Sequence, residues 1–261
     1  MDKRKVIYYS DGLNDEFSTA QITPKKIDGG YRYVYNTPFK RFTRVFWYDV
    51  VAKPLALIYT KAAFHHKIIG GGALKAYKDR AYFIYGNHTH AVCDALIPSM
   101  LNIRKSVYVI VHPNNVSMPV LGRITPSLGA VPLPDGREAY KNFLEAINVR
   151  FSEGCAITIY PEAHIWPYYT GIRPFKDVSF SYPVKLGAPV FCFTNTYQKR
   201  RFGKRPKIVT YVDGPFFADA SLPLHERKTD LRNRVYDRMC ERAKNSNVEM
   251  IKYIRSEDKN G

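Results

Sequence analysis

The chain has 261 residues, of which 45% are apolar, so it can bury a substantial core and wholesale disorder is excluded. Forty lysines and arginines against 23 aspartates and glutamates give a formal net charge of +17, which favours anionic partners such as lipid headgroups, nucleic acid or phosphorylated cofactors. The four cysteines form no CxxC pattern, and we interpret them as reduced thiols of a cytosolic protein.

Residues 1–37 are expected to be irregular apart from one short strand at 31–36, and the first residues lack the apolar core of a signal peptide. Apolar residues then recur at helical spacing from Phe39 to about His65. The most apolar stretch, Val45 to Tyr59, contains charges and a proline and is shorter than the ~20 apolar residues that span a bilayer. It predicts an amphipathic helix that touches the membrane peripherally or, alternatively, an ordinary core helix. The expected location is cytoplasmic, peripherally associated with the membrane, without a transmembrane span.

Strands and helices alternate over most of residues 80–215. The expected strands are 82–85, 107–111, 129–134, 156–160, 189–195 and 208–212, and the expected helices are 90–101, 116–124, 138–150, 177–186 and 224–247. This order predicts an α/β fold with a mixed, largely parallel sheet flanked by helices.

The chain divides by pattern into three parts. Residues 1–66 form a leader with the possible membrane-associating helix, 67–215 form the α/β core, and 216–261 form a charged helix and tail.

Two polar clusters follow expected strands, namely Asn87-His88-Thr89-His90 and Pro161-Glu162-Ala163-His164. Ligands of open α/β sheets bind beyond the carboxyl ends of the strands, so both clusters lie where chemistry is expected. A histidine that removes a proton from a hydroxyl works best near pKa 7, and a carboxylate on its other ring nitrogen fixes the tautomer. His88 or His90 could fill this role with Asp94.

The segment Asn87 to Asp94 resembles the first motif of the lysophosphatidic acid acyltransferase family of glycerolipid acyltransferases, in which an Asn-His pair follows a strand and an Asp comes five residues after the His. Tyr160-Pro161-Glu162 is similar to the third motif of that family, an aromatic-Pro-Glu-Gly-Thr-Arg run. Further similar segments are Leu128-Gly129-Ala130-Val131, Arg173-Pro174-Phe175-Lys176 and Ala188-Pro189-Val190. The resemblance covers residues 67–215 and implies an acyltransferase with the α/β fold of that family.

The first motif departs from the family in its spacing. Five residues separate His88 from Asp94 where the family has four, and one extra residue rotates a helical position by about 100°. Helix spacing alone would pair His90 with Asp94 at i, i+4, where it could simply stabilise the start of a helix. The resemblance selects His88 as the base and Asp94 as its partner, with Asn87 and His90 as supporting residues.

The third motif has Ala163-His164-Ile165 where the family has Gly-Thr-Arg, and the second motif lacks its usual arginine. The acceptor is therefore expected to be a lysophospholipid or related lipid that can differ from lysophosphatidic acid. The residues expected to bind the acceptor or its phosphate are Glu162, His164, Arg173, Lys176 and Arg137. For Glu162 the alternative is a structural carboxylate that bonds loop amides.

The resemblance implies direct transfer from acyl-CoA or acyl-carrier protein to a lipid hydroxyl, without a metal or any other cofactor. Three alternatives remain open. A metal-dependent hydrolase could use His88, His90 and Asp94, although the spacing matches such sites poorly. A basic lipid- or nucleic-acid-binding protein without activity is compatible with the charge, but no nucleic-acid-binding motif is present, so nucleic acid is not expected as a partner. An inactive relative could have kept the fold, although the retained motif residues argue against it.

Overall fold

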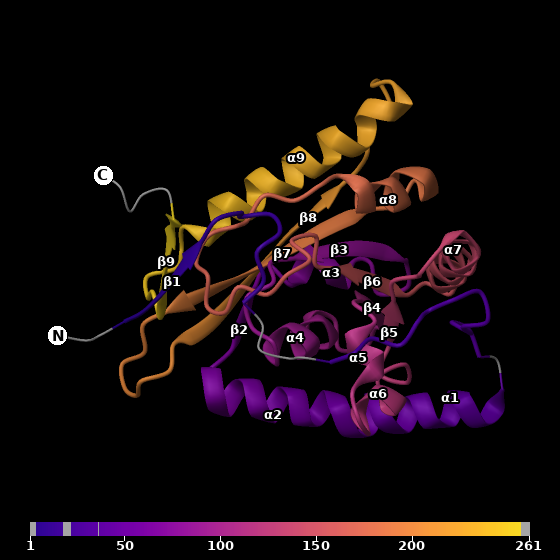
Figure 1. Ribbon diagram of the computed structural model, residues 1–261, viewed down its shortest axis with the longest axis horizontal. Helices are drawn as coiled ribbons and strands as arrows, with labels where there is room; N and C mark the ends of the chain where they lie inside the picture. Colours follow the sequence, from indigo (N-terminus) through magenta and orange to yellow (C-terminus); the bar gives the residue numbers. More distant parts are fainter. Residues whose placement is uncertain (1–3, 18–21, 36, 257–261) are drawn as a thin grey trace.

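The computed structural model describes residues 4–17, 22–35 and 37–256, which build a central sheet between two layers of helices (Figure 1). The sheet has seven strands in the order β2-β8-β7-β3-β6-β4-β5. They are β2 (Lys67–Ile69), β3 (Tyr82–Gly86), β4 (Val107–Val111), β5 (Ala130–Pro132), β6 (Ala156–Ile159), β7 (Val190–Gln198) and β8 (Lys207–Phe216). Every neighbouring pair is parallel except β7 and β8, which are antiparallel. The predicted α/β fold with a mixed, largely parallel sheet is therefore confirmed.

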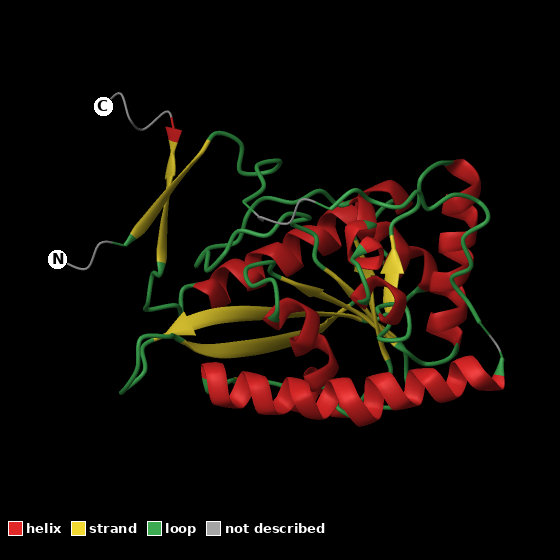
Figure 2. Ribbon diagram, turned by 60° about the horizontal axis from the view of Figure 1, so that its bottom comes forward, coloured by secondary structure: helices red, strands yellow, loops and turns green. Residues whose placement is uncertain are grey.

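Helices cover both faces of this sheet (Figure 2). One layer holds α7 (Arg137–Ser152), α8 (Ser181–Leu186) and α9 (Leu224–Ala243), and the other holds α2 (Lys53–Phe64), α3 (Gly72–Lys75) and α4 (Cys93–Leu101). The central strand β3 is buried along its whole length, with Phe83 and Tyr85 in the first core and Tyr82 and Ile84 in the second. This alternation follows from the two-residue period of a strand that is covered on both faces.

The remaining short elements lie in the connections. They are α5 (Asn114–Ser117), α6 (Leu121–Ile124) and the 3-10 helix η2 (Val178–Phe180). The helix expected over 116–124 is thus two separate single turns, and the one expected over 177–186 divides into η2 and α8.

The helix expected from Phe39 to His65 is present as three consecutive segments that run beneath the sheet (Figure 1). These are α1 (Pro38–Arg44), the π-helical η1 (Val45–Ala52) and α2, which ends where His65 adopts a left-handed conformation at φ 44°. Much of the apolar surface of this helical unit is exposed, including Phe39, Phe42, Val45, Phe46, Trp47, Val50, Leu55, Ile58 and Tyr59. Within the described ranges, no helix is long and apolar enough to cross a membrane.

Strands from the two ends of the described chain pair with each other in a small second sheet. β1 (Lys5–Tyr9) lies parallel to β9 (Ile251–Arg255), far from it in sequence. Tyr253 stacks on Trp166 at 4.9 Å between ring centroids, and Tyr9 contacts the same indole at 4.7 Å. Both strands of this small sheet therefore pack on the loop that follows β6.

Three strands were not foreseen, and one expected strand is absent. β1 and β2 are short and β9 lies in a segment expected to be a polar tail, so their periodic signals are weak. The strand expected at 31–36 is wrong for residues 31–35, and Asn36 lies outside the described residues. Its alternating tyrosines pack on a helix instead: Tyr33 contacts Phe143 of α7 at 5.9 Å and donates its hydroxyl to the carbonyl of Pro132.

Candidate active site

Strand β3 delivers the first polar cluster to the carboxyl edge of the sheet. It ends at Gly86, where a Cβ atom would lie 2.1 Å from Cζ of Phe193, so only glycine fits beside this ring. The next residue, Asn87, donates its side-chain amide to the carbonyl of Asn195 and accepts the backbone N–H of the same residue, at 3.0 and 2.8 Å. The asparagine thus fixes the exit of β3 to the neighbouring strand β7.

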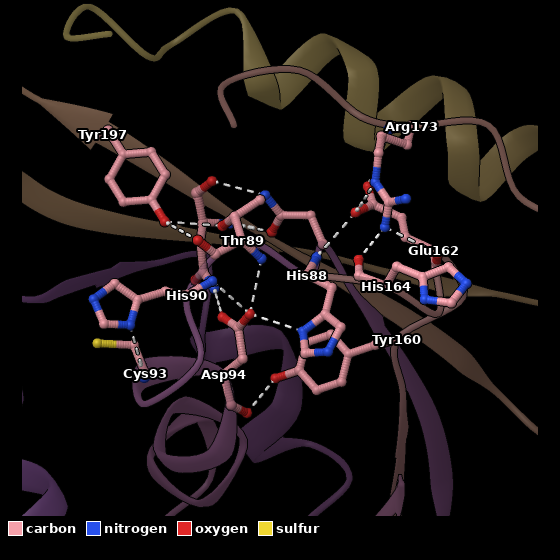
Figure 3. A network of polar contacts seen from close by, with 12 residues as sticks. His88, Thr89, His90, Cys93, Asp94, Tyr160, Glu162, His164, Arg173 and Tyr197 are labelled. Carbon is pink, nitrogen blue, oxygen red and sulfur yellow. Dashed lines mark hydrogen bonds and ion pairs between the residues drawn. The ribbon is translucent and has the colours of Figure 1, made fainter. Parts of the chain in front are cut away.

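His88 and Asp94 lie together beyond this exit (Figure 3). Nδ1 of His88 is 2.9 Å from Oδ2 of Asp94, and this oxygen also accepts the backbone N–H groups of Thr89 and His90 at 2.8 Å each. The carboxyl group is buried, whereas the imidazole keeps 19% of its surface exposed. The loop wraps around the carboxylate, so the turn before α4 absorbs the extra residue of this motif and brings His88 to Asp94.

Two further contacts hold this pair. Nδ2 of Asn195 lies 3.4 Å from Oδ1 of Asp94, so both carboxylate oxygens have a partner. The ring of Tyr160 stacks on the imidazole of His88 at 4.6 Å between centroids, and its hydroxyl donates to the backbone carbonyl of Asp94. Burial raises the pKa of Tyr160 well above its usual value, so this hydroxyl stays protonated and keeps donating. Tyr160 lies within the third motif, yet the sequence did not indicate its contact with His88.

Glu162 is buried between the two loops that form the site. One carboxylate oxygen accepts the N–H of His88 at 3.2 Å, and the other accepts the N–H of Arg173 at 3.1 Å. Burial raises the pKa of Glu162, and the Arg173 guanidinium, whose Nε lies 3.6 Å away, opposes that rise. These contacts are those of the structural alternative, a carboxylate that bonds loop amides.

Three other residues expected to bind the acceptor, Arg173, His164 and Lys176, differ in how far they are exposed. Arg173 is 1% exposed, lies over the ring of Trp166, and donates to the carbonyls of Glu162 and His164, so its guanidinium is engaged within the protein. His164 is partly exposed beside Glu16, at 3.4 Å from its carboxylate, and Lys176 is exposed.

Arg137 is not brought to this cluster. It is exposed at the start of α7, directly after β5, and β5 is the edge strand three positions from β3. At about 4.8 Å per strand, this places the start of the helix on the order of 14 Å away across the sheet. The sequence places Arg137 close to the second motif, but it does not show that β5, which precedes Arg137, is the edge strand.

The ring of His90 turns away from Asp94. Its Nδ1 accepts the backbone N–H of Cys93 at 3.2 Å, and its faces and edges contact Phe64 and Tyr168. Burial lowers the pKa of His90, which favours the neutral imidazole that this hydrogen bond requires. The pairing of His90 with Asp94 that helix spacing suggested is therefore limited to a backbone contact.

The two imidazoles do not converge on the carboxylate as the metal-dependent hydrolase would require. Among the residues that the structure describes, no group of three or more histidines, cysteines, aspartates or glutamates is arranged to hold a metal ion.

The loop after β6 pairs with the loop after β3 through its backbone. Trp166 donates its N–H to the carbonyl of His88 at 3.1 Å, and Tyr168 donates to that of Thr89 at 2.8 Å. The side chain of Thr89 contacts the hydroxyl of Tyr197 at 2.9 Å. The sequence did not predict these contacts. An aromatic residue in a strand, such as Tyr197, is expected to belong to the apolar core and not to a polar network.

An apolar hollow of about 670 Å³ opens on the exposed side of α2. It is lined by Leu55, Ile58, Tyr59, Ala62, Ala63 and Arg205. Phe64, at the end of the same helix, contacts the His90 ring at 4.9 Å. The hollow therefore lies on the helix that borders the polar cluster.

This chain is similar to a known protein family and, in its fold, to a solved structure. The family described as Acyltransferase matches residues 71–194, a span that contains His88, Asp94 and Glu162. A search of the curated proteins found no match. Among solved structures, a 1-acyl-sn-glycerophosphate acyltransferase from Thermotoga maritima is similar, with a TM-score of 0.55 and 20% identity over 79% of this chain and 88% of its own. A mitochondrial ATP synthase from Euglena gracilis reaches a TM-score of only 0.21, with 12% identity over 81% of this chain and 70% of its own, and supports no argument.

Proposed function

We propose that this chain, which matches the acyltransferase family over residues 71–194, transfers a fatty acyl group to a hydroxyl of a lysophospholipid or related lipid at a membrane surface. The observation that carries the proposal is the contact of 2.9 Å between Nδ1 of His88 and Asp94 inside the matched span. A histidine oriented in this way by a carboxylate is suited to act as a general base.

In the proposed reaction, Nε2 of His88 accepts the proton of the acceptor hydroxyl while Nδ1 stays bonded to Asp94. The acceptor oxygen forms a bond to the carbonyl carbon of the acyl thioester, and the carbon–sulfur bond breaks. The departing sulfur takes the proton back from the imidazolium, which restores the neutral base. The co-substrate is acyl-CoA or acyl-carrier protein, and the scheme needs no metal or other cofactor.

We propose that the hollow beside α2 binds the acyl chain of the donor. Its lining is apolar except for Arg205, whose guanidinium lies 6.0 Å from the ring of Phe64. An acyl chain against Leu55 and Ile58 would remove apolar surface from water, at about 25 cal/mol per Å². The cation at its edge could then meet a phosphate of the donor.

The exposed apolar face of α1, η1 and α2 supports peripheral membrane binding. Nine large apolar side chains on this helical unit are exposed, among them Phe39, Phe42 and Ile58, and an apolar face of this extent marks an interaction surface. Lys40 and Arg41 flank it and would meet anionic headgroups. We therefore propose that this helical unit lies in the membrane interface. The same contact would bring a lipid acceptor to His88.

The acceptor phosphate, where there is one, has His164 and Lys176 as the accessible candidates on the loop after β6. Arg173 and Glu162 would act by holding that loop, since both are bonded within the protein.

The test is acyl transfer by the purified protein from radiolabelled acyl-CoA or acyl-carrier protein to a panel of lysolipids in vesicles. His88→Ala and Asp94→Asn should each lower the rate by about 10²–10⁴-fold, the usual contribution of general-base catalysis. His90→Ala, which removes a neighbouring imidazole outside the proposed pair, is the matched control and should keep most of the activity.

Loss of transfer only in His90→Ala and Asp94→Asn would move the base to His90. Absence of transfer from either donor to every acceptor would overturn the proposal.

A further inference from the structure

A second hollow, of about 350 Å³, lies at the other end of the helical unit, against the β5 edge of the sheet. Its walls come from residues 25–35, from α1, from the start of β4, from the α6 region and from the end of α7. Three lysines and four arginines line it, among them Arg32, Lys40, Arg44, Arg123 and Arg150. None of the described residues that line it is acidic.

Two of these arginines are held in place by an aromatic ring. The guanidinium of Arg44 lies 4.2 Å from the ring centroid of Tyr108, and that of Arg150 lies 4.6 Å from it. Arg44 also lies 4.8 Å from the ring of Tyr48, and its terminal nitrogens make only long hydrogen bonds, of 3.4 and 3.5 Å, to the carbonyls of Ser127 and Val107. The ion pairs among the described residues give Arg150 a partner in Glu153 but none to Arg44. Cations gathered without matching carboxylates produce a strong local field for an anion.

The lining also supplies a neutral donor. Burial raises the pKa of Tyr31 to about 12, so its hydroxyl stays protonated. Planar guanidinium groups bind phosphate oxygens in pairs of hydrogen bonds, and a phosphate monoester offers three such oxygens and up to two charges. We infer that this hollow is a binding site for a phosphate monoester group.

The hollow is separate from the catalytic cluster. Tyr108 pairs in register with Ile157, which pairs in turn with Phe83 of β3. Phe83 precedes His88 by five residues, which is about 16 Å along an extended strand. A phosphate held beside Tyr108 is therefore too far from His88 to belong to the reacting acceptor.

The position of α1 favours a membrane lipid as the source of the phosphate. Lys40 and Arg44 line the hollow from the same short helix that exposes Phe39 and Phe42. If those side chains enter the membrane interface, the hollow faces the headgroup layer beside them. The inference that the phosphate belongs to a membrane lipid rests on the membrane contact proposed above. The inference that the hollow binds a phosphate monoester does not rest on that contact.

The experiment compares binding of the catalytically silent His88→Ala protein to phosphatidylcholine vesicles with and without phosphatidate. Arg32→Gln/Arg123→Gln removes two exposed cations from the hollow and leaves α1 intact. Lys185→Gln/Lys244→Gln removes the same charge from the layer of α8 and α9. At about 1 kcal/mol per cation near a charged surface, the first pair should weaken binding to phosphatidate vesicles about tenfold or more. The second pair should change it less than about twofold because charges beyond a Debye length are screened.

Equal losses in the two double variants would overturn the inference in favour of a generally basic surface. Binding of glycerol 3-phosphate, a soluble phosphate monoester, is measured as well. If the protein binds it, Arg32→Gln/Arg123→Gln abolishes that binding, and vesicles with phosphatidate are not preferred, the hollow is a phosphate site whose ligand is a soluble phosphate monoester and not a lipid. Binding of neither probe in the hollow would refute it. Phe42→Ser should weaken binding to both kinds of vesicle, so failure of the membrane contact is distinguishable from failure of the site.

Discussion

The hydroxyl of Thr210 donates to Oδ1 of Asn195 across 2.6 Å, which turns Nδ2 of that amide toward Asp94. The same hydroxyl lies 2.8 Å from Nε2 of His66, and its one hydrogen is already used, so His66 must be the donor. A directed chain of hydrogen bonds therefore runs through four residues, from His66 just before β2 to the Asp94 carboxylate that holds the proposed base. All four side chains are buried.

Thr210→Val should test this chain. The change keeps the shape of the side chain but removes the hydroxyl, so the Asn195 amide loses its fixed orientation. We expect kcat to fall about tenfold with little change in KM, in line with the loss of one oriented hydrogen bond. With less donation to Asp94, the carboxylate should stabilise the His88 imidazolium more, so the acidic limb of the pH–rate profile should move to higher pH. Thr210→Ser should restore both quantities, and an unmoved profile without such rescue would argue for a structural role only.

His66 should contribute to acid unfolding. Burial lowers its pKa from 6.5 to about 4, so between these values the unfolded chain binds a proton that the folded chain rejects. The stabilising effect is complete above pH 6.5 and is lost as pH falls toward 4, and the shift corresponds to about 3 kcal/mol. His66→Gln keeps a donor at the end of the side chain and cannot titrate. Urea unfolding of this variant should therefore depend less on pH within that window, and an unchanged slope would contradict the prediction.

Glu162→Gln should destabilise the fold. The substitution leaves the buried Arg173 guanidinium without its charged partner, and breaking a buried pair typically costs about 3–5 kcal/mol. The free energy of unfolding from urea titration measures this loss. Glu241→Gln is the matched control, because its partner Arg238 and the carboxylate are both solvent-exposed and such pairs contribute less than about 1 kcal/mol. Equal small losses in the two variants would show that Glu162 is not held as a buried ion pair.

Gly86→Ala should disturb the exit of β3. The added Cβ would overlap the Phe193 ring, since the distance to Cζ would be 2.1 Å, and overpacking of this kind costs about 1–3 kcal/mol. Acyl transfer should also fall, because Asn87 and His88 follow directly. Phe193→Leu makes room, so the double variant should be more stable than the sum of the single losses predicts. If the two single losses of stability simply add in the double variant, the alanine destabilises the protein for a reason other than overlap with the Phe193 ring.

The fold could be predicted from the sequence wherever period and length were decisive. The buried strand of β3 and the long α9, with Leu231 and Val235 one helical turn apart, are examples. The enzyme class could also be predicted from the sequence. The acyltransferase prediction rested on motif residues within 71–194 and is confirmed by the family match. The division into 1–66, 67–215 and 216–261 stays a prediction, as do the roles of the site residues.

The remaining features depend on tertiary contacts that the local sequence does not carry. Spacing alone could not choose between His88 and His90, because the choice depends on a loop that wraps its amides around Asp94. Tyr197 and Thr210 take part in polar networks that join separate strands, and each reads as an ordinary strand residue. The pairing of β1 with β9 joins segments at opposite ends of the described chain, where each is too short to give a periodic signal.

That pairing sets the order in which the protein can be completed during synthesis. Trp166 donates its backbone N–H to His88, and its indole packs against Tyr9 and Tyr253. The ribosome releases Tyr253 long after the His88 and Asp94 loop has emerged, so the nascent chain can form its central sheet while Trp166 still lacks one of its two tyrosine neighbours. The packing that supports the backbone around His88 is then finished only after β9 has been synthesised.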